Sequence, residues 1–214
     1  MSVWLVRVQD YEGFCAATGR ARLVPDFPQD NSHPVVRVNA EDAVAFCEWL
    51  TKRELDAGQI EEGQFYRLPT DAEWSLAAGL ADEGGSTPEE RDGKSKEFPW
   101  GKQWPPPASA GNFADTLGKR AGTAIPGYHD GFAQTSPVGS FAANAPGLFD
   151  LSGNVWQWCD GFYKPGSRWG VLRGGSWGTA AAGELRSSYR NVVDRSERDV
   201  IYGFRCVLVP EAGR

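Results

Sequence analysis

The sequence predicts a single α+β domain over residues 1–214, with few helices, short strands and much irregular loop. Three patterns support this class. Only three segments have the apolar spacing of an amphipathic helix, and all of them lie in the N-terminal part of the chain. Strand-like patterns are short and gather toward the C terminus. The 26 glycines and nine tryptophans indicate many turns and a core packed with aromatic rings.

The first predicted helix covers residues 8–18. Val8, Tyr11 and Phe14 fall at helical spacing there, and Gly19 follows as a stop signal. A proline-rich loop comes next and leads to a strand-like run of valines at residues 35–38.

Two further helices are predicted from their capping signals. Asn39 can cap a helix that has Asp42 in its first turn and ends near Gly58. The segment 70–73, Thr-Asp-Ala-Glu, has the pattern of a capping box and predicts a third helix that stops at about residues 79–81.

Residues 81–145 contain no pattern that predicts a regular element. The charged, Gly- and Ser-rich stretch 82–97 is interpreted as an exposed insertion. A compact domain needs metal ions or many side-chain contacts to hold so long an irregular segment. Strand patterns return at 153–158 and 171–177, and residues 202–209 predict a terminal strand.

Composition excludes several classes of protein. The formal net charge of −6 argues against a general nucleic-acid binder, which needs a basic face. No apolar run approaches the roughly 20 residues of a membrane helix. Residues 1–10 lack the pattern of a signal peptide, so a reducing, cytoplasmic setting is the default expectation. The four cysteines form no C-x-x-C pair, and Cys15 and Cys47 are expected to be buried thiols.

Six motifs occur in the order typical of one family. The chain resembles the formylglycine-generating enzyme family, also called the sulfatase-modifying factor domain, from about residue 4 to residue 209. The motifs are EDAVAFCEWL (41–50), YRLPTDAEW (66–74), GLFDLSGNVWQW (147–158), VLRGGSW (171–177), RSSYRN (186–191) and GFRCVL (203–208).

The resemblance implies a C-type lectin-like fold of the formylglycine-generating type, with short twisted antiparallel strands. The resemblance also allows the start of this chain to be compared with the usual start of the family. Members of the family usually open with a strand that carries a Gly-Gly turn, and this chain begins after that point. Two explanations are open: the chain is the C-terminal part of a longer protein, or its first strand differs from that of the family.

The resemblance also separates enzyme from binder. Members that oxidise sulfatase cysteines hold copper with two cysteines, and those positions fall here on Ala182 and Ser187. Copper(I) requires soft thiolate ligands, so no copper and no formylglycine chemistry are expected. A related branch holds iron with three histidines, whereas this chain has only His33 and His129.

A non-catalytic module that binds a protein or a small molecule is the preferred interpretation. The segment 178–202, between the motifs 173–177 and 203–205, resembles the variable region of proteins diversified by retroelements. Mutation of an Asn codon at its adenines can yield most of the residues found there, but not Glu184 or Glu197. The proposed ligand-binding residues are Gly178, Thr179, Ala181, Ala182, Tyr189, Val192, Val193, Asp194, Arg195, Arg198 and Tyr202.

Two alternatives stay open: an ordinary regulatory domain of a bacterial signalling protein, and an oxidoreductase of the formylglycine-generating type, which the missing thiols disfavour. The binding hypothesis makes a geometric prediction. Residues 178–184, 189, 192–200 and 202 should share one exposed face, and Arg186, Ser188 and Arg190 should point into the domain.

Finally, the resemblance implies structural calcium, whose oxygen ligands irregular loops can supply. The first implied site uses the Asn112 side chain, the Phe113 carbonyl, Asp130 and the Phe132 carbonyl. The second uses Asp150, the carbonyls of Gly153 and Val155, and Gln157 in place of the usual Glu. Loss of that negative charge should weaken the second site.

Overall fold

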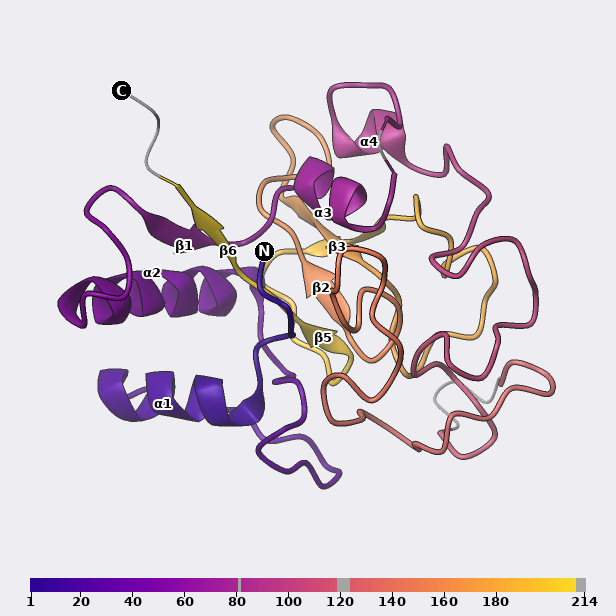
Figure 1. The fold of residues 1–214 in the computed structure, drawn as a ribbon, viewed down its shortest axis with the longest axis horizontal. Helices are drawn as coiled ribbons and strands as arrows, with labels where there is room; N and C mark the ends of the chain where they lie inside the picture. Colours follow the sequence, from indigo (N-terminus) through magenta and orange to yellow (C-terminus); the bar gives the residue numbers. More distant parts are fainter. Residues whose placement is uncertain (81, 119–123, 211–214) are drawn as a thin grey trace.

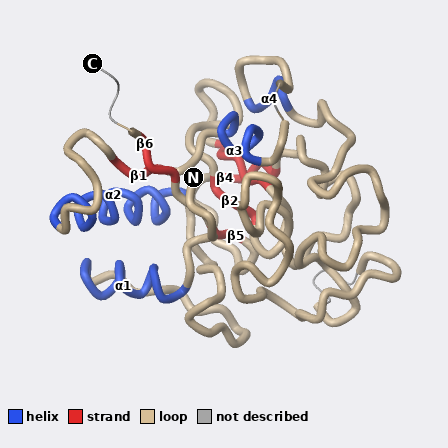
Figure 2. Tube along the Cα trace, in the orientation of Figure 1, coloured by secondary structure: helices blue, strands red, loops and turns tan. Residues whose placement is uncertain are grey.

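Two long helices lie side by side at one end of the molecule, and long loops form the other end (Figures 1 and 2). The computed structural model describes residues 1–80, 82–118 and 124–210. No helix within these ranges is both long and apolar enough to cross a membrane. The α+β class predicted from the sequence is confirmed.

The helices begin and end at the predicted signals. Helix α1 spans Val8–Thr18 and ends at Gly19, whose φ of 71° is left-handed. Helix α2 spans Ala40–Asp56, and the Asn39 side chain accepts a hydrogen bond from the Asp42 amide. Helix α3 spans Asp71–Ala77, where Thr70 and Glu73 form the predicted capping box. A single further turn, α4, spans Pro88–Arg91.

The strands form two small sheets. Strand β1 (Phe65–Arg67) pairs antiparallel with β6 (Val207–Val209). The second sheet has the order β4-β3-β2-β5. Its strands are β2 (Trp156–Trp158), β3 (Trp169–Arg173), β4 (Asn191–Asp194) and β5 (Tyr202–Gly203).

Several strand predictions were wrong. The terminal strand expected at 202–209 is two strands, β5 and β6, in different sheets. The β2–β5 pair is parallel, so the strands are not all antiparallel. The alternation at 153–158 has no counterpart in burial, because this segment is buried throughout. The valines at 35–38 are buried but form no regular strand, since a loop path between α1 and α2 places them in the core.

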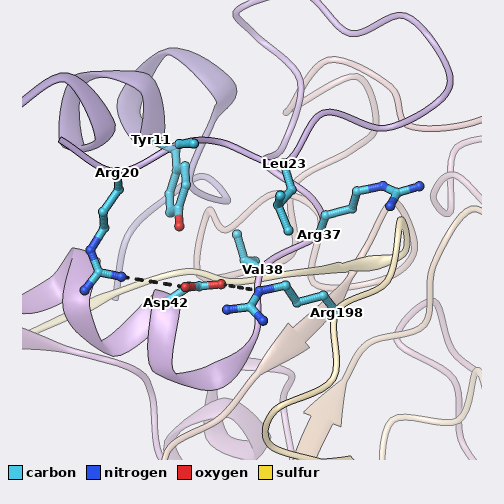
Figure 3. Close-up of a pocket in the computed structure, with 8 residues that line it drawn as sticks. Tyr11, Arg20, Leu23, Arg37, Val38, Asp42 and Arg198 are labelled. Atoms are coloured by element: carbon cyan, nitrogen blue, oxygen red, sulfur yellow. Dashed lines mark hydrogen bonds and ion pairs between the residues drawn. The ribbon is translucent and has the colours of Figure 1, made fainter. Parts of the chain in front are cut away.

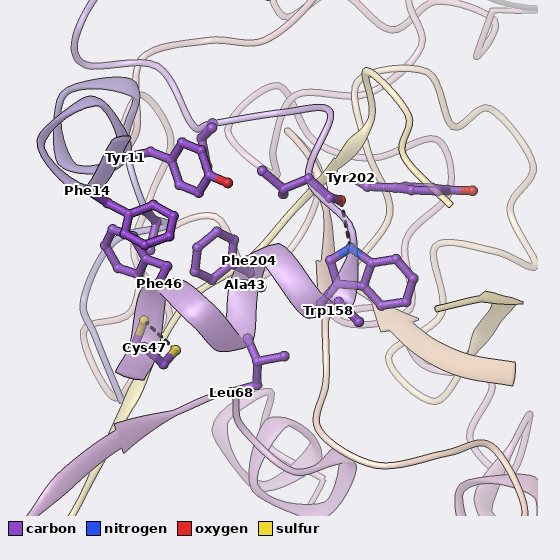
Figure 4. Close-up of a cluster of buried hydrophobic side chains, with 14 of the residues drawn as sticks. Tyr11, Phe14, Ala43, Phe46, Cys47, Leu68, Trp158, Tyr202 and Phe204 are labelled. Atoms are coloured by element: carbon purple, nitrogen blue, oxygen red, sulfur yellow. Dashed lines mark hydrogen bonds between the residues drawn. The ribbon is translucent and has the colours of Figure 1, made fainter. Parts of the chain in front are cut away.

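The main core lies between the helix pair and the four-stranded sheet (Figure 4). Its aromatic rings pack edge to face, as between Phe46 and Phe204, whose centroids are 5.3 Å apart. The Trp158 indole donates to the Val38 carbonyl over 3.0 Å. All four cysteines are free and buried, as expected for Cys15 and Cys47. The sulfur of Cys47 lies 3.4 Å from that of Cys206.

The stretch 82–97 is not simply an exposed insertion. Many of its side chains are exposed, but the Glu83 side chain is only 3% exposed and forms an ion pair with Arg190. Such contacts hold the long irregular region, of which residue 81 and residues 119–123 lie outside the described ranges.

Candidate binding site in the C-terminal segment

A buried network of charged side chains lies beneath the segment that follows β3. Asp71, the first residue of α3, accepts hydrogen bonds from Arg173 and from Arg190, the latter over 3.1 and 3.0 Å. Glu83 accepts two more from Arg190, over 2.7 and 2.6 Å. Both arginine side chains are fully buried. This cluster therefore joins helix α3, the loop after it, β3 and the C-terminal segment.

The carboxylates of this network are held in the ionised form by the guanidinium groups around them, to which Arg91 adds a further hydrogen bond to Asp71 over 3.2 Å. Burial alone would raise the pKa of Asp71, but the guanidinium groups of Arg173 and Arg190 hold it below the ordinary value. The pKa of Glu83 is lowered in the same way, because hydrogen bonds from Arg190 and Ser75 outweigh its burial. Both carboxylates are thus ionised at neutral pH, and the buried positive charges are compensated.

Residues 93–97 run beside residues 187–188 and fix their backbone. The Ser188 hydroxyl donates to the Ser95 carbonyl and accepts from the Ser95 amide, each over 2.8 Å. The Gly93 amide donates to the Ser188 carbonyl over 3.0 Å, and the Ser187 amide to the Glu97 carbonyl over 2.9 Å. From below, Arg173 donates to the Ser187 carbonyl over 2.8 Å. This part of the segment is held on two sides.

A pocket of about 320 Å³ opens above this floor. Its Tyr189 ring is partly buried and lies 5.9 Å from the Trp156 ring, centroid to centroid. Of the predicted binding residues, Ala181 and Tyr189 line it. The others that line it are Gly93, Gly183, Glu184 and Arg186. No sequence pattern points to Gly93, because this residue belongs to a loop that is distant in the sequence.

The inward residues were predicted largely correctly. Ser188 and Arg190 are buried, with 0% and 1% exposure. Arg186 is only partly buried and lines the pocket, although its Nε atom is fully buried. The anchor before the segment behaves as expected, since Gly174 has a φ of 98° and a Cβ there would lie 2.7 Å from the Leu151 carbonyl oxygen.

The prediction of one continuous exposed face was wrong. Thr179 and Tyr202 are buried, with 4% and 7% exposure, because Thr179 hydrogen-bonds Ser176 and Tyr202 packs on Trp158. Several other predicted residues do not line the pocket. Gly178 and Ala182 are partly buried, although Ala182 stands between two lining residues. Strand β4 contains Val192, Val193 and Asp194, and Arg195 donates to the Gly161 carbonyl.

Arg198 lines a different cavity, of about 240 Å³, between α1 and the start of α2 (Figure 3). There Arg198 donates to the Asp42 carboxylate over 2.8 Å, and Arg20 lies 3.8 Å from it. Arg37 also lines this cavity, but its guanidinium points away from the Asp42 carboxylate (Figure 3). Arg198 is therefore engaged in an ion pair with α2.

The two positions that would hold copper in the related oxidases both lie close to the pocket. Ala182 stands between the lining residues Ala181 and Gly183, and Ser187 is buried with 4% exposure. The thiols of the chain lie elsewhere: Cys15, Cys47 and Cys206 belong to the main core, and Cys159 packs near Trp74.

The first implied calcium site has a donor set that fits the ion. The side-chain oxygen of Asn112 is buried and has no hydrogen-bond partner. Asp130 accepts from the amides of Phe113 and Phe132 over 2.8 and 2.9 Å, which places its carboxylate near the same two residues. Burial raises the pKa of Asp130 to about 6, as expected for a carboxylate with no cation beside it. Asn112, Phe113, Asp130 and Phe132 would supply the oxygens.

The second implied site does not fit a cation. The Gln157 side-chain oxygen already accepts from Trp74 over 3.1 Å and from Arg205 over 2.8 Å. Its amide nitrogen donates to the Asp150 carbonyl over 2.8 Å. The buried Arg205 guanidinium supplies positive charge near Asp150 in place of an ion. Among the described residues, no group of three or more His, Cys, Asp or Glu side chains could hold a metal.

Known proteins that resemble this chain belong to the family that the sequence motifs indicate. Residues 4–209 match the family described as "Sulfatase-modifying factor enzyme 1-like domain". The chain is 34% identical to an inactive C-alpha-formylglycine-generating enzyme 2 from Mus musculus over 85% of its own length and 50% of that protein. It is 33% identical to a formylglycine-generating enzyme from Thermomonospora curvata, over 67% of the chain and 37% of that enzyme. The chain thus spans half or less of these relatives.

A third relative is the serine/threonine-protein kinase pkn1 of Chlamydia pneumoniae, 28% identical over 94% of the chain and 28% of the kinase. Two solved structures share the fold. PvdO from Pseudomonas aeruginosa has a TM-score of 0.70 and 24% identity, covering 96% of this chain and 78% of its own. Treponema denticola variable protein 1 has a TM-score of 0.62 and 22% identity, covering 94% and 81%.

Proposed function

Because the chain belongs to the family of sulfatase-modifying factor enzyme 1-like domains and has its C-type lectin-like fold, we propose that it is a non-catalytic binding module. Its binding site is the pocket lined by Gly93, Ala181, Gly183, Glu184, Arg186 and Tyr189. Its ligand is a small molecule or part of a protein.

One observation carries this proposal. The residues where related oxidases place their copper-binding thiols are Ala182 and Ser187, and neither side chain can replace a thiolate on copper(I). The pocket nevertheless persists beside them, on a floor fixed by Arg173 and Ser188. A preformed pocket loses little conformational entropy when it binds a ligand. A binding site without the oxidising centre is therefore the function that this arrangement best supports.

The family contains both kinds of protein, since the matched relatives include formylglycine-generating enzymes and a paralogue named inactive. The decisive experiment incubates the wild-type chain with copper(I) and a sulfatase peptide and measures formylglycine by mass spectrometry. We expect no product and no tight copper binding. The double variant Ala182→Cys/Ser187→Cys should bind copper(I) without turnover, and formylglycine from the wild type would overturn the proposal.

We also propose that the exposed part of the segment is a site of sequence diversification. The fold shared with the T. denticola variable protein supports this only at the level of architecture. Diversified positions should be those with exposed side chains, which removes Thr179 and Tyr202 from the set. An adenine-differing repeat of this DNA segment beside a reverse transcriptase gene would support diversification. Sibling sequences that do not vary at Ala181 and Tyr189 would contradict it.

A second candidate function is a regulatory domain attached to a signalling kinase. The similarity to pkn1 favours it, because almost the whole chain matches only about a quarter of that kinase. The same pocket would then act as the sensor. A kinase domain encoded in the same reading frame would support this alternative, and its absence would leave the isolated binding module.

For the first calcium site we propose a structural ion held by Asn112, Phe113, Asp130 and Phe132. The support is the unpartnered Asn112 oxygen together with the adjacent buried carboxylate. A calcium ion would satisfy both groups and hold the loop around residues 112–132 in place of a backbone ladder.

A further inference from the structure

Glu184 and Arg186 line the pocket with opposite charges and lack partners of their own. Within the described residues, neither side chain forms a hydrogen bond or an ion pair, and both side chains are only partly buried where they line the pocket. Burial alone accounts for the raised pKa of Glu184, so no counter-charge stands beside it. A ligand that fills this pocket would strip water from both charged groups, which is costly unless the ligand pairs with each of them. Two unpaired charges of opposite sign in one pocket therefore indicate a ligand that satisfies both.

The arrangement also limits the charge of the ligand. A simple anion would pair with Arg186 but would face the carboxylate of Glu184. A simple cation would pair with Glu184 but would leave the Arg186 donor unpaired and meet its positive charge. Only a ligand that carries a positive and a negative group satisfies both residues.

The rest of the pocket sets the size and the character of the ligand. Its volume of about 320 Å³ is at the lower end of small-molecule sites, which span roughly 300–1,000 Å³. The Tyr189 ring, held by Trp156, offers an aromatic face, and Ala181 and Gly183 leave room above it. An apolar or aromatic side chain of modest size would pack there.

We infer that this pocket binds a small zwitterion of the size of a free amino acid. Glu184 accepts hydrogen bonds from the ammonium group, Arg186 donates to the carboxylate, and Tyr189 packs against the side chain of the ligand. The inference rests on the proposed binding function of the segment and names the class of ligand. The same charge pair on a peptide would have to come from two residues, which the volume of the pocket disfavours.

The test uses isothermal titration calorimetry with the purified chain and the twenty free L-amino acids. At least one should bind, and its N-acetyl and amide derivatives should each bind about tenfold or more weakly, because each lacks one of the two charges. Glu184→Gln should remove the preference for the free amine over the N-acetyl form. Arg186→Gln should remove the preference for the free acid over the amide.

Because each variant should lose a different preference, the test distinguishes a change in ligand recognition from a loss of folding. A loss of folding would weaken the binding of all ligands equally. Glu62→Gln and Arg168→Gln, at exposed residues outside the pocket lining, are the matched controls and should leave both preferences intact. The inference is overturned if no amino acid binds or if both derivatives bind as well as the parent. If a monosaccharide, monocarboxylate or monoamine binds instead and Tyr189→Ala abolishes it, the zwitterion inference fails while the proposed binding function stands.

Discussion

Arg190 and Asp71 are 119 positions apart in the sequence, yet two hydrogen bonds of 3.1 and 3.0 Å join their buried side chains. Asp71 also accepts from Arg173 and from Arg91, so it and Glu83 together compensate the two buried guanidinium groups of Arg173 and Arg190 and pair with that of Arg91. The position of the candidate site depends on this cluster, because Arg173 is the last residue of β3 and Arg190 immediately precedes β4, so the two arginines bracket the segment that carries the site.

Asp71→Asn should destabilise the protein by about 3–5 kcal/mol, since removing one partner of a buried ion pair leaves uncompensated charge. Chemical denaturation followed by tryptophan fluorescence measures the loss. Asp56→Asn is the matched control, because Asp56 pairs with Lys52 on the surface with 64% exposure and should cost less than about 0.5 kcal/mol. A loss below about 1 kcal/mol for Asp71→Asn would mean that the cluster contributes little.

The same cluster predicts how acid unfolds the protein. The pKa values of Asp71 and Glu83 are lowered in the folded state, so their contribution is present above the ordinary values of 3.8 and 4.5. It is lost as the pH falls below those values toward the folded pKa values. The wild type should therefore lose stability steeply below about pH 4.5. In Asp71→Asn this slope should be visibly shallower, and an unchanged slope would contradict the lowered pKa values.

Ser188→Ala should loosen the contact between the binding segment and residues 93–97. The hydroxyl both donates to and accepts from Ser95, and its loss leaves two partly buried backbone groups unpaired, at a cost of about 1 kcal/mol or more. Hydrogen exchange of the Ser95 amide should accelerate. Ser196→Ala, which removes an exposed hydroxyl bonded only to Asp194, should change neither quantity. Unaltered exchange at Ser95 would show that the segment is held by other contacts.

Tyr202 and Val192 should respond very differently to truncation. Tyr202 is 7% exposed and packs on Trp158 at 5.8 Å between centroids, so Tyr202→Ala should cost about 3–5 kcal/mol through loss of core packing. Val192 is only partly buried in β4, and Val192→Ala should cost about 1 kcal/mol. Equal losses in denaturation experiments would place both residues in the same environment and refute the structural assignment.

How much the sequence predicts depends on how local the signal is. Gly19, Asn39 and Thr70 mark the helix ends correctly, because caps involve residues only a few positions apart. Strand β4 was not predicted, because its extended conformation comes from pairing with β3 and not from a pattern in its own residues. Glu83 and Arg190 are 107 positions apart, so their contact leaves no local pattern in the sequence. The charged stretch 82–97 was therefore interpreted as exposed. For the same reason the sequence located part of the pocket, Ala181 and Tyr189, but not its wall at Gly93.

Calcium should remove the pH dependence of stability that Asp130 produces. Its pKa in the folded state is raised from 3.8 to about 6, chiefly by burial, so the folded protein favours the protonated carboxyl group. Without calcium, its stabilising contribution is present below pH 3.8 and is lost as the pH rises through about 6. A pKa shift of this size can change the free energy of unfolding by at most a few kcal/mol. Because the carboxyl group is partly solvated, the expected change is about 1 kcal/mol.

In chelator, the unfolding free energy attributable to Asp130 should therefore fall by about 1 kcal/mol between pH 5 and pH 7. Excess calcium should remove the fall, because the ion binds only the ionised carboxylate and stabilises the folded state, by about 2.7 kcal/mol at 100 times its Kd. Asp130→Asn should abolish the response to calcium. Asp82→Asn is the control, since Asp82 also accepts a backbone amide but is exposed in a turn. If the melting temperature of the wild type is the same in chelator and in calcium at pH 7, the loop around Asn112 and Asp130 is held without a metal, and the unpartnered Asn112 oxygen needs another explanation.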